Sequence, residues 1–425
     1  GKNTSGEGFG IPTLEAASCG IPSVVTDFTC YSDDTRVYTE NGLKYFKDVK
    51  ERENVWSLNL KNDKLTLQPI DKIIKKKYNG IMYNFKKPNI DLFVTPDHNM
   101  VIKTYKNTKT KRGWKKPLND YWEIKKASDL EKEGAIQIPL TCRWKGKKNN
   151  KLFHFPLFDK KTNANTLNDI NLCDFAELMG WYISEGFISK DNIKDYNLTT
   201  ICNPKNNKYD KYLLKILDRN HISYIRQGDE LRIYSKQLCM MFKECGKGAL
   251  NKIIPYWIME YEKPVLKALF RGLVYGDGSI GDGYKDNFKY FGTSSEKLAE
   301  QFVLLCLKLG WTAHIHKEIP KKGFFGNREI KNINPHYRIY IRHSENKGFL
   351  STSKKRKNIH YKKIQYKGNV WCISVKNTHN LLVERNGKFA FCGNTTPELL
   401  IENGKCGEPV KLVGTEVYDL HDLMF

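Results

Sequence analysis

Three residues of the chain carry nucleophiles suited to breaking and re-forming its own peptide bonds. At Cys30 the sequence turns from small residues to a segment rich in Lys, Asn and Tyr. A thiol there can attack the carbonyl of Thr29 and make a thioester, which is a better acyl donor than an amide. At the far end of the segment, the side-chain nitrogen of Asn394 can attack its own carbonyl and cleave the chain as a succinimide. The hydroxyl of the next residue, Thr395, can accept the acyl group first. Together these groups could remove the segment and join its flanks.

The two flanks read as one sequence when residues 30–394 are left out, because the junction then becomes SVVTDFTTTPELLIENGKCGEPV. In the first flank, GEGFGIPTLEA places a glycine-rich loop before a helix, and such a loop can hold a phosphate through free backbone N–H groups. Glu7 and Glu15 bracket this loop. The flanks resemble the donor-binding half of retaining glycosyltransferases with two Rossmann-like domains. The resemblance implies that Glu7 lies near the donor sugar, that Glu15 binds the nucleotide ribose, and that the joined host binds a nucleotide sugar.

The segment 30–394 itself resembles an intein. Its opening, CYSDDTRVYTENG, and its closing stretch, VWCISVKNTHNLLVERNGKFAFCGN, match the family's terminal blocks. The stretch LFVTPDHNMVI holds the family's Thr-x-x-His pattern, which implies that Thr95 and His98 polarise the first scissile bond and protonate its nitrogen. His379 falls on the family's downstream histidine, which assists cyclisation of Asn394.

Two residues of the closing block depart from the family's pattern. Gly393 stands where His is common, and this leaves open what assists the cyclisation. Cys372 stands where Asp is common. Its thiol either coordinates the steps or is a small buried core group.

Two further stretches, LMGWYISEG (178–186) and FRGLVYGDG (270–278), place an acidic residue at the end of the same pattern. Each has two small residues four positions apart, and such residues share one face of a helix. The pattern predicts two helices that approach backbone to backbone and end at Glu185 and Asp277, at the bottom of their interface.

An alternating strand follows each of these motifs. LRIYSK and YRIYIR each separate a basic and aromatic face from an apolar one, with the period of two that is typical of a strand. A basic, aromatic sheet face suits a surface laid on DNA. The residues expected on this face are Arg232, Tyr234, Lys236, Arg338, Tyr340 and Arg342.

This duplicated unit resembles the LAGLIDADG homing endonucleases, whose half-domain is an αββαββα repeat. The resemblance implies that Glu185 and Asp277 bind Mg²⁺ between them, since carboxylate oxygens are hard donors suited to that ion. Lys252, in NKIIP, matches the lysine that tunes the nearby water. Lys357 is the candidate for its counterpart in the second repeat. The implied partner is a long double-stranded DNA site, and the target that follows from homing is the gene of the uninterrupted host.

Composition agrees with a polyanion partner. The 425 residues carry a formal charge of +24, and both flanks are acidic, so the basic excess lies between them. The 11 cysteines form no CxxC pair, which favours a reduced, cytoplasmic setting. No apolar run reaches membrane-spanning length. His314 and His316 alternate on an expected strand without a third ligand, so no metal site is predicted there.

These motifs need three kinds of element to position them. The expected fold class is mixed: an all-β splicing domain of the horseshoe-like Hint type, an α+β LAGLIDADG endonuclease with two αββαββα repeats, and flanks from an α/β Rossmann-like domain. The expected divisions are 1–29 (first flank), 30–140 (first part of the splicing domain), 141–171 (linker), 172–362 (endonuclease), 363–394 (last part of the splicing domain) and 395–425 (second flank).

The favoured interpretation is a self-splicing intein with an embedded endonuclease, placed within a glycosyltransferase. One alternative is a glycosyltransferase with a permanent DNA-binding insert. A second is a splicing intein whose endonuclease is inactive and is retained for binding or structure.

Overall fold

Two long strands join the beginning of the inserted segment to its end. β7 (Lys72–Lys87) runs antiparallel to β27 (Tyr361–Ser374), with Lys72 opposite Ser374 and Phe85 opposite Tyr361. Together with β2 (Tyr31–Ser32) and β8 (Ile90–Val94) they close a small barrel. The computed structural model describes residues 23–25, 30–105, 108–110, 113–115, 117–148, 151–156, 167–190, 197–203, 207–280, 288–319, 324–325, 328–329, 334–343, 348–353, 358–394, 398–402 and 410–413.

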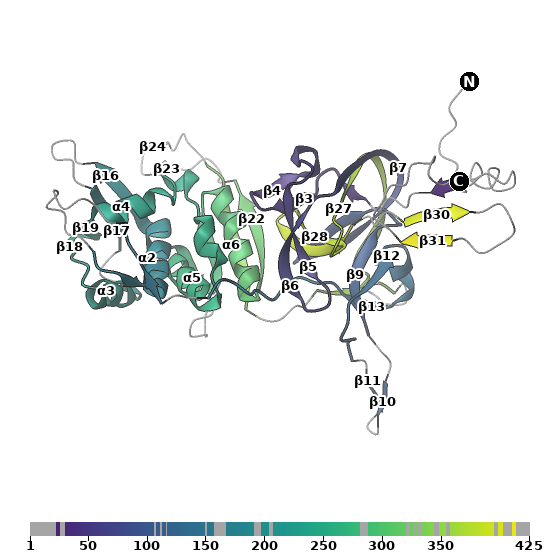
Figure 1. The fold of residues 1–425 in the computed structure, drawn as a ribbon, viewed down its shortest axis with the longest axis horizontal. Coiled ribbons are helices and arrows are strands. Elements are labelled where there is room, and N and C mark those ends of the chain that lie inside the picture. The colour runs from purple at the N-terminus through teal and green to yellow at the C-terminus, as the bar shows by residue number, and fades with distance from the viewer. Residues whose placement is uncertain are drawn as a thin grey trace, which may run out of the picture.

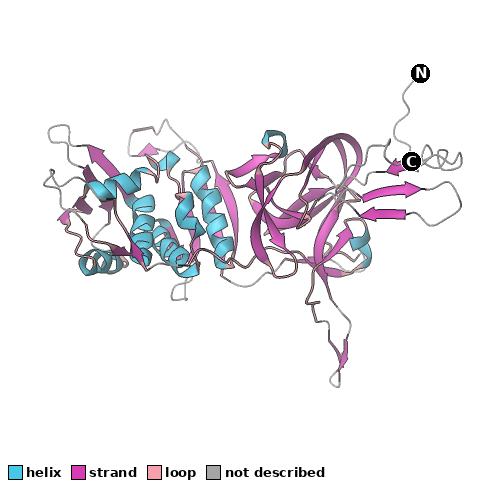
Figure 2. Ribbon diagram, in the orientation of Figure 1, coloured by secondary structure: helices cyan, strands magenta, loops and turns pink. Residues whose placement is uncertain are grey.

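The molecule is elongated and has two lobes (Figure 1). We call residues 30–140 and 348–394 the strand-rich lobe and residues 141–343 the helical lobe, a division that the colouring by secondary structure makes plain (Figure 2). Besides the barrel, the strand-rich lobe contains two short 3₁₀ helices, at Phe46–Asp48 and Asp129–Lys132. Its other strands are β3 (Arg36–Thr39), β4 (Gly42–Tyr45), β5 (Asn54–Asn59), β6 (Lys64–Pro69), β9 (Asn99–Thr104), β10 (Thr108–Thr110), β11 (Gly113–Lys115), β12 (Glu123–Lys126), β13 (Ala135–Gln137), β26 (Phe349–Ser351), β28 (Asn380–Arg385) and β29 (Lys388–Gly393).

The helical lobe contains a complete first repeat and a shortened second one. The first repeat has the expected αββαββα order: α2 (Leu172–Glu185), β16 (Gly186–Lys190), β17 (Asn197–Cys202), α3 (Asp210–Arg219), β18 (Ile225–Gln227), β19 (Glu230–Tyr234) and α4 (Lys236–Lys243). The 3₁₀ turns Ala249–Asn251 and Tyr256–Glu260 lead to the second repeat. The second repeat has α5 (Lys263–Asp277), β20 (Gly278–Ile280), β21 (Phe288–Thr293), α6 (Glu296–Leu309), β22 (Thr312–Glu318), the hairpin β23 (Phe324–Phe325) and β24 (Arg328–Glu329), and β25 (His336–Arg342).

The prediction of a second complete αββαββα repeat is therefore wrong for its last element. In the described part of the chain no helix follows β25. The chain instead returns to the strand-rich lobe as β26, which pairs with β13. The backbone groups of β26 find their partners in that sheet, so a return strand takes the place of the closing helix.

The two long helices α2 and α5 touch through their backbones, as the small residues predict. A Cβ added at Gly272 would lie 2.0 Å from the Glu177 carbonyl oxygen, and one at Gly180 would lie 2.5 Å from the Leu269 carbonyl oxygen. Ser184 adds a hydrogen bond from its hydroxyl to the Leu273 carbonyl at 2.8 Å. Any larger side chain would separate the helices and with them the two acids at their ends.

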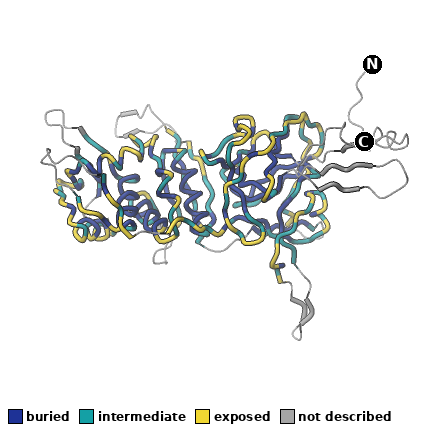
Figure 3. The backbone as a smooth tube through the Cα atoms, in the orientation of Figure 1, coloured by how far each residue is buried: buried dark blue, intermediate teal, exposed yellow. Residues whose placement is uncertain are grey.

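The two lobes share one sheet and one core. The sheet runs in the order β20-β21-β25-β22-β29-β28-β3-β5-β6, with β4 beside β3, and it crosses from lobe to lobe where β22 meets β29. Gly387 makes the crossing possible, because a Cβ there would lie 1.9 Å from the Ile315 carbonyl oxygen. The core around α5 and α6 includes Trp56 and Phe391 of the strand-rich lobe. Figure 3 shows buried chain continuing through both lobes.

The segment 141–171, expected as a linker, is part of this shared structure. It contains β14 (Leu152–Phe153) and β15 (Ile170–Asn171), and it buries Cys142, Phe155 and Ile170 in the core of the helical lobe. The linker prediction is wrong for these residues, because their apolar side chains have a core to enter.

Short strands of the two flanks also pair with each other. β1 (Ser23–Val25) is antiparallel to β30 (Glu398–Glu402), which is antiparallel to β31 (Val410–Val413). This flank sheet is antiparallel and separate from the sheets of the two lobes, whereas the sheet of a Rossmann-like domain is mainly parallel.

Replacing Gly272 with Ala should destabilise the protein by about 1–3 kcal/mol, since the new methyl group would force the two helix backbones apart. Urea titration followed by far-UV circular dichroism measures the change. Gly80→Ala is the matched control, because the nearest atom its Cβ would meet is the end of the Tyr78 side chain, at 3.0 Å. Equal stability losses in the two variants would contradict the close helix contact.

Candidate functional site

Cys30 lies directly before β2 in the barrel and is 1% exposed. The hydroxyl oxygen of Thr95, just after β8, accepts the Cys30 backbone N–H at 3.1 Å, and the Thr95 N–H donates to the Cys30 carbonyl at 3.0 Å. Burial, and after it the neighbouring Cys372 thiol in the same apolar cluster, raises the pKa of the Cys30 thiol above its usual range. The thiol is therefore neutral at rest, and Thr95 holds the backbone on both sides of it.

His98 contacts both ends of the segment. Its backbone N–H donates to the Thr95 carbonyl at 3.1 Å and closes the turn after β8. Its buried ring lies edge-on to Tyr31, with ring centroids 4.4 Å apart, and its Nε2 is 3.3 Å from the Sγ of Cys392. Tyr31 follows the first junction and Cys392 precedes the second, so one imidazole lies between them.

Asn394 directly follows β29 and is fully buried. Its backbone N–H donates to the His379 carbonyl at 3.1 Å, and its side-chain amide donates to the Val375 carbonyl at 3.4 Å. The amide of Asn99 donates to the Asn394 carbonyl at 3.2 Å. The Oδ1 of Asn394 has no hydrogen-bond partner among the described residues. The carbonyl that its own amide must attack is thus polarised by a donor from another strand.

His379 lies in the turn between β27 and β28 with a φ of +51°. Burial lowers the pKa of its imidazole, so the ring is held neutral near pH 7. Its Nδ1 is buried and has no hydrogen-bond partner within the described part of the chain. The strained turn directs the backbone carbonyl of His379 to Asn394 and leaves a ring nitrogen available for proton transfer.

Gly393 is a position where no side chain fits. A Cβ there would lie 2.0 Å from the Asn99 carbonyl oxygen, so the His that is common at this position has no room. The Gly393 carbonyl accepts a 2.5 Å hydrogen bond from the Tyr31 hydroxyl. The backbones of Gly393 and Asn99 approach each other closely here, so no side chain can occupy this position.

Three residues of this site were not found by the sequence analysis: Tyr31, Asn99 and Cys392. Tyr31 and Asn99 each directly follow a residue that was predicted, and Cys392 is buried on β29, where the residues from Phe389 to Gly393 are all buried. Their roles depend on contacts across some 290 residues or more of sequence. No local pattern could have shown those contacts.

A second candidate site lies at the ends of α2 and α5. Glu185 and Asp277 line one cavity of about 780 Å³ together with Lys252 and His336. Burial raises the pKa of both carboxyls, and the charge of Glu185 helps to raise that of Asp277 to about 7. The Lys252 ammonium donates to the Tyr182 carbonyl at 2.9 Å, and burial lowers its pKa to about 8. The cavity therefore contains two carboxylates that repel each other and a lysine beside them.

This donor set fits a divalent cation. The two carboxylates come from different helices, burial raises the pKa of both, and the charge of Glu185 further raises that of Asp277. A cation between them would relieve this unfavourable charge. Within the described residues no third His, Cys, Asp or Glu joins a cluster, so backbone carbonyls, DNA phosphates or water would have to complete the coordination. His336 was not predicted; it begins β25 and has no motif to identify it.

The basic strand faces are largely as predicted. On β19 and β25 the residues Leu231, Ile233, Ile339 and Ile341 are buried, and the predicted DNA-facing residues alternate with them. Arg232 is paired with Glu230 at 2.8 Å, and Arg338 with Glu318 at 2.9 Å. These two arginines of the face are therefore ion-paired with acidic side chains. A phosphate that binds these arginines would have to displace the acidic side chains.

Lys236 is the exception, because it was predicted on the strand but lies on the helix that follows. β19 ends at Tyr234, and the Ser235 hydroxyl caps the next helix by accepting the Leu238 N–H at 3.3 Å. Lys236 therefore opens α4 and does not continue the strand face, because a serine N-cap outweighs the alternation. Tyr340 stacks on His314, with centroids 5.2 Å apart, and Arg342 closes β25.

Four predicted residues lie outside the described part of the chain: Glu7, Glu15, Lys357 and Thr395. Their roles stay predictions. His314 and His316 join no cluster of three metal-binding side chains in the described structure. Burial first, and then nearby Arg342, lowers the pKa of His314 to about 4, which fits a ring packed in a sheet.

Comparison with known proteins identifies the central region. Residues 264–382 match the family model of the LAGLIDADG-like domain. The interpretation of a LAGLIDADG domain is thereby confirmed for this part of the chain. The match runs from α5 through the second repeat and into β28, so it continues into the strand-rich lobe.

Three relatives carry the names of unrelated enzymes. The chain is 27% identical over 321 residues to an ATP-dependent Clp protease proteolytic subunit of Chlamydomonas moewusii, which covers 70% of this chain and 29% of that protein. It is 23% identical over 393 residues to a ribonucleoside-diphosphate reductase subunit beta of Aquifex aeolicus, covering 88% and 51%. It is 29% identical over 201 residues to a DNA polymerase of Thermococcus litoralis, covering 44% and 10%. The chain thus spans about half the length of the reductase subunit and less than a third of the length of the other two relatives.

Among solved structures, I-DmoI in complex with its target DNA is 16% identical to this chain, covers 40% of it and 89% of its own chain, and gives a TM-score of 0.28. A variant of the Ssp DnaB mini-intein is 16% identical, covers 27% and 67%, and gives a TM-score of 0.19. In the described part of the chain, no helix is both long and apolar enough to cross a bilayer.

The raised pKa of Asp277 predicts a specific pH dependence of stability. Its folded pKa of about 7 lies above the ordinary value of 3.8, so the folded state binds more protons than the unfolded state between those values. Metal-free protein should therefore lose stability as pH rises through that window, by a few kcal/mol in all. Asp277→Asn should flatten the slope, as urea titrations in EDTA at several pH values would show. The exposed Asp129→Asn is the control, and a slope that both variants leave unchanged would refute the burial of Asp277.

Proposed function

We propose that residues 30–394 form a self-splicing intein that carries a site-specific DNA endonuclease in its middle. The observation that carries the proposal is the meeting of the two ends of this segment in one buried site. Tyr31, next to the first junction, donates to the Gly393 carbonyl, and Asn99 donates to the Asn394 carbonyl. Splicing needs both junctions in one place, and a permanent insert does not.

The relatives support an insertion. A protease subunit, a reductase subunit and a DNA polymerase share little chemistry, yet each resembles part of this chain over a fraction of its own length. A segment that interrupts unrelated hosts accounts for this pattern. The flanks then belong to the host, for which we propose a glycosyltransferase that binds a nucleotide sugar through Glu7 and Glu15 once it is joined.

The first step of splicing follows from the first junction. The Cys30 thiol attacks the Thr29 carbonyl carbon, a C–S bond replaces the C–N bond, and the Cys30 nitrogen leaves with the proton it needs. The Thr95 hydroxyl accepts the N–H of that nitrogen, and we assign to His98, at the end of the turn that begins at Thr95, the role of supplying the proton. Because burial keeps the thiol neutral, its proton must move to another group during the attack.

The later steps follow from the second junction. The Thr395 hydroxyl attacks the thioester and releases the Cys30 thiol, which makes a branched ester. The Asn394 amide nitrogen then attacks its own carbonyl carbon, the succinimide forms, and the Thr395 amine leaves. That amine attacks the ester to give the final peptide bond. In this scheme Asn99 polarises the Asn394 carbonyl, and His379, whose pKa burial lowers, moves the proton.

For the endonuclease we propose double-stranded DNA as the substrate and Mg²⁺ as the metal that Glu185 and Asp277 hold. When bound, the metal would activate water for attack on phosphorus and stabilise the leaving oxygen. The match of 264–382 to the LAGLIDADG-like domain supports this proposal, as does the closed contact of α2 with α5. In this proposal Lys252 holds a water, and the basic residues of β19 and β25 bind phosphates.

We also propose a cytoplasmic setting. The first nucleophile must stay a thiol, and the nine cysteines of the described structure are all free. Reduced cysteines are the rule in that compartment.

Splicing predicts two products from one chain: the joined flanks and the free segment of 365 residues. Cys30→Ala should prevent joining, because no thioester can form, and Asn394→Ala should prevent release at the second junction. Intact mass measurement of the expressed protein checks both. Cys173→Ala, a cysteine change in the helical lobe, should splice like the parent. Joined flanks in Cys30→Ala would overturn the assignment.

Cleavage predicts that the excised segment linearises a plasmid that carries the uninterrupted host gene, when Mg²⁺ is present. Asp277→Asn or Glu185→Gln should abolish cutting while leaving much of the DNA binding, since binding rests on the strand faces. Asp129→Asn, the same charge change in the other lobe, should cut normally. Splicing should survive all three changes. Failure of the parent to cut this target or a randomised library would favour the inactive-endonuclease alternative.

A further inference from the structure

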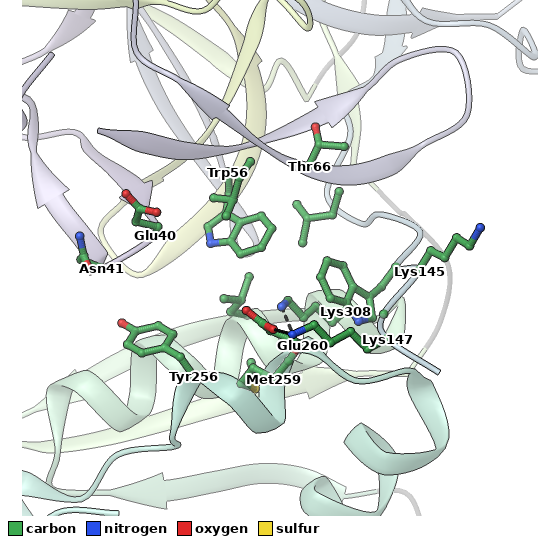
Figure 4. Close-up of a pocket in the computed structure, with 15 residues that line it drawn as sticks. Glu40, Asn41, Trp56, Thr66, Lys145, Lys147, Tyr256, Met259, Glu260 and Lys308 are labelled. Carbon is green, nitrogen blue, oxygen red and sulfur yellow. Dashed lines mark hydrogen bonds and ion pairs between the residues drawn. The ribbon is translucent and has the colours of Figure 1, made fainter. Parts of the chain in front are cut away.

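A cavity of about 530 Å³ lies where the two lobes meet, away from both sites described above. Its upper wall in Figure 4 is β5 and β6 of the strand-rich lobe, and its lower wall is the helical lobe. The segment that carries Lys145 and Lys147 closes one side, and Trp144 of the same segment also lines the cavity. Leu65, Leu67, Met259 and Leu304 supply an apolar lining. Its volume is typical of sites for small ligands.

A buried cation forms part of this cavity. Lys308, on α6, is only 2% exposed, and its ammonium lies 3.7 Å from the ring centroid of Trp144 and 4.8 Å from that of Trp56. Its ammonium donates to the Met259 carbonyl at 2.9 Å. Burial lowers the pKa of Lys308 to about 7, against the charges of the Cys142 thiol and of Glu260, and Glu260 is itself ion-paired with Lys147. An anion in the cavity would therefore favour the charged form of this lysine.

A buried donor without a partner also faces this cavity. Trp56 is 8% exposed, its indole nitrogen points into the gap between the lobes, and that N–H has no hydrogen-bond acceptor in the described structure. The neighbouring indole of Trp144 is different, because its N–H donates to the Tyr261 carbonyl at 2.8 Å. Leaving a buried N–H unpaired costs about 1–3 kcal/mol, which an acceptor on a ligand would recover.

The acids of the cavity are already engaged. Glu40 accepts hydrogen bonds from the backbone and the side chain of Asn54, at 3.3 and 3.0 Å. Glu260 is ion-paired with Lys147. The unsatisfied groups are therefore donors, the Trp56 N–H and the Lys308 ammonium. A cationic ligand is disfavoured, since Lys308 already occupies the place over the aromatic rings.

We propose that this cavity binds a small aromatic carboxylate. The carboxylate would accept from the Trp56 indole N–H and from the Lys308 ammonium. Its planar body would lie against the two indoles, whose rings are 6.0 Å apart at their centroids and inclined by 74°. A single negative charge balances the one buried ammonium; a phosphate would bring more charge than these donors neutralise.

The test uses the full chain and 1-naphthoate as the probe, with tryptophan fluorescence and calorimetry as readouts. Saturable binding of one equivalent is expected. Lys308→Met and Trp56→Phe should each weaken it about tenfold, the loss expected for one hydrogen bond to a charged group. Trp56→Phe keeps an aromatic ring in the core, so it tests the N–H without depending on a variant that alters packing strongly.

Two controls separate this site from non-specific uptake. Trp122→Phe changes an indole whose N–H donates to Asp63, outside the cavity, and it should bind the probe like the parent. 1-Naphthylmethylammonium, of the same shape and opposite charge, should not bind. Absence of saturable binding, which would mean that water alone fills the cavity, would overturn the proposal. Equal affinity in all variants, or preference for the cation, would also overturn it. None of these outcomes depends on splicing or DNA cutting.

Discussion

The pairing of β7 with β27 is the constraint on which the rest of the structure depends. It ties residues 72–85 to residues 361–374, and through β2 it places Tyr31 opposite Trp371. Closing so long a loop is entropically unfavourable for a chain without structure in between. The folded helical lobe removes most of this entropic cost. The chain leaves the strand-rich lobe after β13 and returns to it as β26, and these two strands are paired. The two junctions can therefore meet although 364 positions separate them in the chain.

The two candidate sites use burial in opposite ways. Around Cys30 and Asn394, burial holds the reacting groups neutral and excludes water, which would otherwise hydrolyse a thioester. Around Glu185 and Asp277, burial makes ionised carboxylates unfavourable, so the site gains from a cation. The first site is closed, and the second lines a cavity large enough for a phosphodiester. Both rest on backbone contacts that only glycine permits, at Gly393 and at Gly272.

Much of the local structure could be predicted, and most of the cross-chain contacts could not. The small residues of α2 and α5, the alternation of β19 and β25, and the positions of Thr95 and His98 after β8 depend on near neighbours, and the structure agrees with them. Lys236 was misplaced because the cap formed by Ser235 outweighs a strand pattern. Cys392, Asn99 and the β22–β29 crossing depend on residues far away in the chain, and a single sequence carries no signal for those pairings. The prediction of a closing helix for the second repeat was wrong for the same reason, since the chain at that point pairs as β26 with a strand of the other lobe.

The shared core changes how mutation acts on this protein over generations. α6 belongs to the endonuclease by its place in the chain, but it packs with Trp56 and Phe391 of the strand-rich lobe, and its Glu300 pairs with Arg36 on β3 at 3.0 Å. Under the proposed function, selection on the host gene would require only that the interruption be removed. That selection would nevertheless act on α6, because losing this helix would expose the core of the strand-rich lobe. A lineage that no longer cut DNA would therefore accumulate changes at Glu185 and Asp277 well before it lost the helix.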